Sequence, residues 1–132
     1  MALTFIRVLT NPCAAQTINS AATYTSAEQD GGDNTIFEQI WLYLEVDGFA
    51  AAPAGNEQMI VTIAPIHTTA GSHFVDQAVS HVFTVVADAL YDFAIPLCSL
   101  PRFYKVLVEN DTGQNTDAGA VDVWIETIEV TH

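Results

Sequence analysis

Histidine side chains are the residues of this chain best suited to chemistry, and three of the four lie close together in the sequence. His67, His73 and His81 flank Asp76, and imidazole nitrogens together with a carboxylate oxygen are ligands that zinc prefers in proteins. Their spacing matches no familiar zinc-ligand motif, and histidines beside a polar loop are usually surface groups. The cluster is a candidate metal centre for which we expect no bound metal.

Two loops rich in aspartate could hold calcium, because hard cations take carboxylate and amide oxygens as ligands. The first contains Asp30 and Asp33, and the second contains Asp111, Asn115 and Asp117. Neither follows the residue pattern of a helix-flanked calcium loop, and Asp or Asn in a turn usually accepts hydrogen bonds from its own backbone. We expect ordinary turns here, with calcium left open as the alternative.

No arrangement typical of catalysis is visible in the sequence. No serine stands in a Gly-x-Ser-x-Gly elbow, and the seven glycines are scattered among turns instead of forming a phosphate-binding loop. Carboxylate pairs such as Glu126 and Glu129 exist, but sixteen acidic residues make chance pairs unavoidable. We predict that the protein is not an enzyme, with no catalytic residues and no cofactor.

The two cysteines, Cys13 and Cys98, are far apart in the sequence, and neither belongs to a Cys-x-x-Cys pair. That spacing excludes a zinc knuckle or a dithiol redox motif. We predict two buried free thiols, and a disulfide between them stays open for an oxidising compartment.

Acidic residues outnumber basic ones sixteen to three, and the net charge of −13 belongs to a chain that is 50% apolar. The acids are scattered singly along strand-like runs, which indicates the solvent side of a folded β-protein and not a disordered tail. Three cations cannot form a surface that follows phosphates, so nucleic acid and anionic membranes are excluded as direct ligands. Residues 1–9 read as a strand and not as a signal peptide, and no apolar run is long enough to cross a membrane.

Valine, isoleucine, threonine and aromatic residues dominate, and turn residues recur at short intervals, which is the pattern of an all-β sandwich or barrel. The chain has no repeat or linker, so we predict one domain, residues 1–132. We expect about seven to nine strands, near residues 3–9, 16–25, 36–47, 58–66, 73–79, 82–87, 91–97, 102–110 and 120–131.

One stretch, residues 74–90, is ambiguous, because four of its five valines, Val75, Val79, Val82 and Val86, would also line one face of a helix. Its high content of β-branched residues favours a strand.

The last two predicted strands alternate most regularly, and we predict that they form a hairpin. The core face of that hairpin would pair Val108 with Val121, Val106 with Val123, and Tyr104 with Ile125. On its other face, Lys105 would lie over Trp124, between Asp122 and Glu126.

The apolar alternation of the last strand changes phase after Ile125, because Ile128 and Val130 belong to the other phase. A β-bulge inserts one extra residue into a strand, so that the side chains after it return to the same face of the sheet. We therefore predict a bulge near residues 126–127.

The strand predicted at 36–47 is apolar on both faces, and one face carries Phe37, Trp41 and Tyr43. In a two-layer sandwich one face packs on the core, so the other needs a cover. We predict Phe37, Trp41 and Tyr43 as a subunit interface, with a covering loop or N-terminal arm as the alternative. Trp41, Tyr43 and Trp124 could also stack on sugar rings, although their positions in mid-strand favour packing.

Two segments resemble the small acidic β-proteins of tailed-bacteriophage particles, the head decoration and capsid-stabilising class. Residues 17–26, TINSAATYTS, resemble a Ser/Thr/Ala-rich strand that such proteins place near their start. Residues 103–114, FYKVLVENDTGQ, resemble their "yyKvvveNdtg" strand, which precedes a last strand close to the C-terminus. The acidic, cysteine-poor, single-domain character is similar too. The resemblance supplies no functional residue to carry over.

The resemblance implies a module that binds the outside of a protein shell and adds apolar contacts across subunit junctions. With the strand pattern, it predicts an antiparallel β-sandwich of jelly-roll or immunoglobulin-like type that acts as a non-catalytic virion structural protein, a capsid decoration protein. Its partners would be the major capsid protein or other virion proteins and further copies of itself, commonly as a trimer. It would be made in the host cytoplasm and located in the virion. A carbohydrate- or receptor-binding module and a phage tail or minor component are the alternatives.

Overall fold

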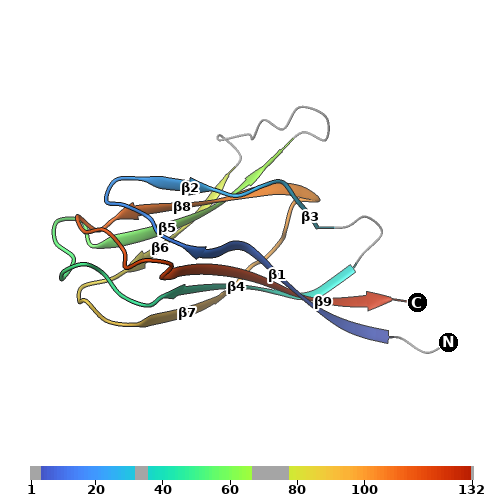
Figure 1. Ribbon diagram of the computed structural model, residues 1–132. Helices are drawn as coiled ribbons and strands as arrows, with labels where there is room; N and C mark the ends of the chain where they lie inside the picture. The colour runs from blue at the N-terminus through green and yellow to red at the C-terminus, as the bar shows by residue number, and fades with distance from the viewer. Residues whose placement is uncertain (1–3, 32–35, 67–77, 132) are drawn as a thin grey trace.

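The computed structural model describes residues 4–31, 36–66 and 78–131, with only the backbone of residues 36–38 and 131. These residues form nine strands and no helix that could span a membrane. Two antiparallel sheets pack face to face (Figure 1), which confirms the predicted β-sandwich. The strands are β1 (Thr4–Gln16), β2 (Thr23–Thr25), β3 (Gln29–Asp30), β4 (Ile36–Val46), β5 (Gln58–Pro65), β6 (Val79–Thr84), β7 (Tyr91–Pro96), β8 (Phe103–Asp111) and β9 (Val121–Thr131).

The order of the strands identifies the sandwich as a jelly roll. The four-stranded sheet runs β1-β9-β4-β7, and the five-stranded sheet runs β2-β8-β5-β6 with β3 also on β8. With β3 set aside, four pairs are nested along the chain: β1 with β9, β2 with β8, β4 with β7, and β5 with β6. One long antiparallel hairpin rolled into two sheets has this nesting. An immunoglobulin sandwich keeps its first two strands in one sheet, whereas β1 and β2 lie in different sheets here.

The core lies between the sheets and is lined by alternate residues of each strand. In β8 the side chains of Tyr104, Val106 and Val108 are buried, while those of the intervening residues Phe103, Lys105 and Leu107 are half-buried. The same period of two residues buries alternate positions of β5 and the first half of β9. The largest fully buried side chains of the described residues are Phe49, Leu42, Leu44, Met59 and Ile125.

The predicted hairpin of the last two strands is wrong, because β8 and β9 belong to different sheets. The core faces of the two strands were assigned correctly, since Val106 and Val123 are both fully buried. They face the interior from opposite sheets and are not neighbours in one sheet. Lys105 pairs with Ala64 of β5, so it does not lie over Trp124, which pairs with Tyr43.

The predicted bulge at residues 126–127 is also wrong. Both residues of β9 continue the pairing with β1 and with β4 without interruption. The register shifts lie in the partner strands, between Thr10 and Gln16 of β1 and between Phe37 and Gln39 of β4. The change of phase has another cause, because Ile128 pairs with Arg7 on the outer face, which becomes apolar at this end of the sheet.

Strand boundaries differ most near the N-terminus. The strand predicted at 16–25 is instead the end of β1, a loop and the short β2. Ala21, in the loop between β1 and β2, has a positive φ of 64°, which is not the backbone of an extended strand. Ala15, with a φ of 46°, lies within β1 at the register shift between Cys13 and Gln16. Most of the strand predicted at 73–79 lies outside the described residues. The described part of the ambiguous stretch contains the strand β6 and no helix.

Candidate functional site

The outer face of the four-stranded sheet brings together three aromatic side chains from two neighbouring strands. Tyr43 of β4 pairs with Trp124 of β9, and Trp41 pairs with Glu126. Directly paired residues of antiparallel strands point to the same side of a sheet, so Trp41, Tyr43 and Trp124 share this face. All three are half-buried. The aromatic set predicted as a sugar platform is therefore one continuous surface, which we call the aromatic face.

Only part of the predicted subunit interface can be placed. Trp41 and Tyr43 lie on the aromatic face, whereas the side chain of Phe37 is outside the described residues. The backbone of Phe37 pairs with Glu129, and the register shift between Phe37 and Gln39 separates this pair from the regular pairing of Trp41 and Tyr43.

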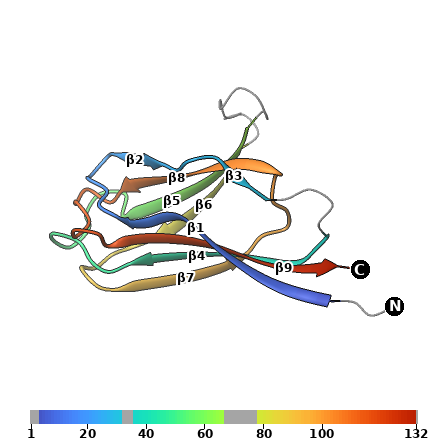
Figure 2. The same ribbon diagram turned by 45° about the vertical axis from the view of Figure 1, so that its right-hand side comes forward.

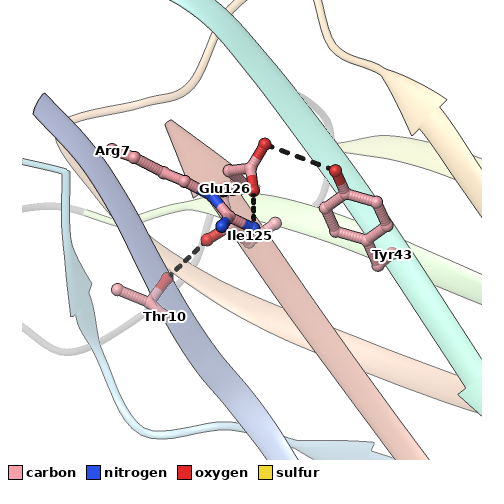
Figure 3. A network of polar contacts seen from close by, with 5 residues as sticks. All are labelled: Arg7, Thr10, Tyr43, Ile125 and Glu126. Carbon is pink, nitrogen blue, oxygen red and sulfur yellow. Dashed lines mark hydrogen bonds and ion pairs between the residues drawn. The ribbon is translucent and has the colours of Figure 1, made fainter. Parts of the chain in front are cut away.

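A buried carboxylate anchors one side of the aromatic face (Figure 3). Glu126 is only 7% exposed, and it accepts a hydrogen bond from Nε of Arg7 and forms an ion pair with the same guanidinium. The hydroxyl of Tyr43 donates to the other carboxylate oxygen at 3.3 Å. Burial, followed by the charge of Glu126, raises the pKa of Tyr43. Three strands, β1, β9 and β4, thus meet in one polar network.

A shallow hollow of about 260 Å³ opens beside this network. It is lined by Arg7, Leu9, Tyr43, Glu45 and Trp124. The hollow combines aromatic rings with one cation and one exposed carboxylate, which are groups that bind amphipathic ligands or side chains of a partner protein.

A row of carboxylates borders the hollow. Glu45 pairs with Asp92 on one side and with Asp122 on the other. Burial raises the pKa of Glu45, and the charges of Asp92, Asp122 and Asp47 raise it further. Like charges in directly opposite positions of a sheet repel one another, so this part of the face attracts cations and repels other acids.

We expect Glu45→Gln to stabilise the protein at pH 7 by about 0.5 kcal/mol, a value reduced for solvent screening. A raised pKa means that ionising the Glu45 carboxyl group destabilises the folded state. This destabilisation is fully present above the pKa of the folded state and is absent below the pKa of the unfolded state. The gain should therefore disappear as the pH falls below the ordinary pKa of 4.5. Urea unfolding at pH 7 and at a pH below 4.5 measures the difference in stability. Glu28→Gln, at an exposed position, is the charge-matched control. A loss of stability at pH 7 would contradict the repulsion.

A second hollow, of about 280 Å³, opens at the edge of the sandwich between β6 and the loop after β7. Nε2 of His81 is buried there without a hydrogen-bond partner, and burial lowers the pKa of this imidazole. Its lining is largely apolar and consists of Ile63, Val79, His81, Pro96, Leu97, Cys98, Ser99 and Pro101.

No group of three or more His, Cys, Asp or Glu side chains is placed to hold a metal within residues 4–31, 36–66 and 78–131. His67, His73 and Asp76 lie outside these ranges, so the predicted histidine cluster stays untested. Asp33 of the first candidate calcium loop lies outside them as well.

In the second candidate calcium loop, Asp111 and Asn115 accept hydrogen bonds from other loops. Oδ1 of Asn115 accepts a hydrogen bond from the backbone of Ser20 at 2.8 Å. Asp111 accepts one from the side chain of Asn56 at 3.0 Å. These oxygens accept hydrogen bonds from segments far away in the sequence, and not from their own backbone as the turn interpretation expects.

The two thiols are free, but they are not both buried as predicted. Cys13 is fully buried, and Cys98 is exposed in the loop after β7. Burial and the charge of Asp122 raise the pKa of Cys13 to about 12. Since the thiolate is the reactive form, Cys13 has almost none of it at pH 8.

We expect iodoacetamide at pH 8 to modify one thiol per folded chain, Cys98, and two thiols per chain in urea. Mass spectrometry counts the added groups. The matched variants Cys98→Ser and Cys13→Ser should give none and one, respectively, in the folded state. Modification of Cys13 as fast as that of Cys98, or no modification in urea without reductant, would contradict the expectation.

The fold and the site define the class of protein: an all-β jelly-roll sandwich with an aromatic, partly acidic outer face. No family model matches the chain, and no curated protein matches it. One solved structure that it is similar to comes from Bacillus endospore appendages, described as a novel family of disulfide-linked pili. The two align over 98% of this chain and 88% of the other, with 12% sequence identity and a TM-score of 0.37. That likeness supports no conclusion about function, and the resemblance to phage virion proteins stays a prediction.

Proposed function

We propose that this chain is a non-catalytic virion structural protein that binds the outside of a phage capsid through its aromatic face. The observation that carries the proposal is the presence of three half-buried aromatic side chains, Trp41, Tyr43 and Trp124, on one rigid sheet face. Partly exposed aromatic clusters of this kind are typical of protein-protein contacts, where Trp and Tyr contribute a large share of the binding energy.

Two further features support the proposal. The nested jelly-roll order is frequent among viral capsid and lectin domains, which is an argument by analogy of fold. The row formed by Glu45, Asp92 and Asp122 beside the aromatic face suits a shell surface that offers Lys or Arg side chains at the same place. Complementary charge of this kind favours correct partners and repels wrong ones.

The test uses particles of the phage whose genome encodes the chain, purified on a density gradient. We expect the protein in these particles at a fixed ratio to the major capsid protein. Trp41→Asp should fold, because the ring is only half-buried, and should be lost from the particles. Val82→Asp, which changes an exposed side chain of the five-stranded sheet, is the matched control and should be retained. Retention of Trp41→Asp on the particles would exclude the aromatic face as the contact.

A carbohydrate-binding role is the second candidate, favoured by the hollow beside Trp124. Its rings could stack on a sugar while Arg7 and Glu45 bond hydroxyl groups. Screening the purified protein on a glycan array tests this role, with Trp124→Ala as the variant that should lose binding. An absence of binding to any glycan would remove the candidate. A tail component, the remaining alternative, predicts rings or tubes under the electron microscope.

A further inference from the structure

The acidic residues of this chain are distributed unevenly. Residues 1–27 contain neither Asp nor Glu, so all sixteen acids of the protein follow residue 27. The strands β1 and β2 both belong to this acid-free segment, and each is an edge strand of its sheet. The hydroxyl of Tyr24 in β2 donates to the carbonyl of Pro12 in β1 at 3.4 Å, so both edges lie on the same side of the sandwich.

The first half of β1 is an exposed edge on this side. Phe5–Thr10 pairs with β9 in regular register, and no other described strand pairs with it. The N-terminal end of β1 and the C-terminal end of β9 extend together beyond the five-stranded sheet (Figure 2). As a result, apolar side chains are exposed on both faces of one strand: Phe5 is 60% exposed, Ile6 44% and Leu9 46%.

The proline and the register shifts that normally prevent an edge strand from pairing with another chain lie in the second half of β1. Pro12 and two register shifts, between Thr10 and Cys13 and between Cys13 and Gln16, interrupt that half. Proline, bulges and charged side chains are the usual protection against pairing with another chain. The segment Phe5–Leu9 has no proline or bulge, and its single charge, Arg7, is neutralised by Glu126.

We propose that Phe5–Leu9 pairs with the same segment of a second copy of this chain. A two-fold axis perpendicular to the sheet makes the two β1 strands antiparallel and joins two four-stranded sheets into one. In a pairing centred on Arg7, Phe5 of each copy lies beside Leu9 of the other on the outer face, and Ile6 beside Val8 on the inner face. The segment is thus complementary to itself.

Charge favours a second copy at this side and not elsewhere. Two molecules of net charge −13 repel each other, and the repulsion is smallest where acid-free strands approach. The two Arg7 side chains would face each other with their own Glu126 carboxylates beside them. Glu129, which pairs with Ile6, is the one further acid on this part of β9. Because the contact is small, it belongs with weak interfaces, and the dimer should dissociate on dilution.

Sedimentation equilibrium at moderate salt tests this proposal, which is independent of the proposed function. The mass should rise with protein concentration from the chain mass of 14.3 kDa toward twice that value, and added salt should strengthen the dimer by screening the repulsion. Leu9→Lys and Ile6→Lys, at positions 46% and 44% exposed where a lysine side chain can reach solvent, should each weaken dimerisation at least about tenfold, that is by about 1.4 kcal/mol. Circular dichroism of each variant checks that it is folded.

Val82→Lys is the matched control, because Val82 is 55% exposed on β6, the edge strand at the far side of the five-stranded sheet. It changes the net charge by the same amount and should leave the dimer unchanged. Hydrogen exchange should show the amides of Phe5–Thr10 slowing as the concentration rises. The proposal is overturned by a wild type that stays monomeric at all concentrations, by a trimeric mass, or by a dimer that Val82→Lys weakens and Leu9→Lys does not.

Discussion

Asn110→Asp should lower the free energy of unfolding by about 4 kcal/mol, the largest effect that we expect from a single polar substitution. Asn110 is fully buried at the end of β8. Its amide nitrogen donates to the carbonyls of Ile18, at 2.8 Å, and Gln114, at 2.7 Å. Its amide oxygen accepts from the backbone and the hydroxyl of Thr112, at 3.2 and 2.6 Å. An aspartate has no donor, so a buried carboxylate would face two carbonyl oxygens.

The main chain of Asn110 adds to this connection. Its N–H donates to the carbonyl of Ala22 at 3.0 Å, and its carbonyl accepts from Ala21 at 2.8 Å. The residue therefore joins the loop before β2 to the turn after β8. Gly113 completes this turn with a φ of 80°, and a Cβ there would lie 2.7 Å from the carbonyl oxygen of Ala54. The Asn-Asp-Thr-Gly sequence of residues 110–113 thus has a structural role in this chain.

Urea unfolding followed by circular dichroism measures the effect. Asn110→Ala should cost about 3 kcal/mol, because it leaves the same carbonyls without donors but adds no charge. Asp111→Ala is the control from the same turn, and it should cost less than about 1 kcal/mol because its one hydrogen bond is exposed. If Asn110→Asp were as stable as Asp111→Ala, the buried network would not contribute as described.

Arg7→Ala should lower the free energy of unfolding by about 2 kcal/mol, the second large effect. The substitution leaves Glu126, with a side chain only 9% exposed, without its cationic partner. Hydrogen bonds to a charged group contribute about 1.5–3 kcal/mol. The Arg7 side chain is 67% exposed, so solvent screens it and the loss falls short of the 3–5 kcal/mol typical of a fully buried pair.

A double-mutant cycle separates the ion pair from the packing of the arginine stem. Glu126→Gln removes the charge with little change of shape, so Arg7→Ala should cost about 1 kcal/mol less in that background. Tyr43→Phe removes one hydrogen bond at 3.3 Å and should cost less than about 1 kcal/mol. If Arg7→Ala cost the same in both backgrounds, the ion pair would not stabilise the fold.

The sequence-based predictions that the structure confirms depend on the alternation of apolar and polar residues along single strands. A strand places successive side chains on opposite faces, so the buried set Tyr104, Val106 and Val108 could be read from β8 alone, as could Val123 and Ile125 from β9. The common face of Trp41 and Tyr43 follows from the same rule. The all-β class and the approximate positions of most strands were therefore predictable.

The choice of partner strands was not predictable in this way. The alternation of a strand shows which of its faces is buried, and it is the same whether two strands are neighbours in one sheet or face each other across the core. For this reason the predicted β8–β9 hairpin failed. The jelly roll pairs the first strand with the last and so separates β8 from β9. The same long-range pairing places Arg7 and Glu126 together although they are 119 residues apart, and no local signal in the sequence links them.

The sequence by itself determined which residues face the core along most strands, the all-β class and the acidic exterior, because each depends on a local period or on composition. Only the tertiary structure decided which strands pair, where the register shifts, and that Trp124 lies beside Tyr43 while Lys105 lies in the other sheet. Those properties depend on contacts between segments far apart in the chain. Such contacts are set by the packing of whole sheets, which a period of two residues does not encode.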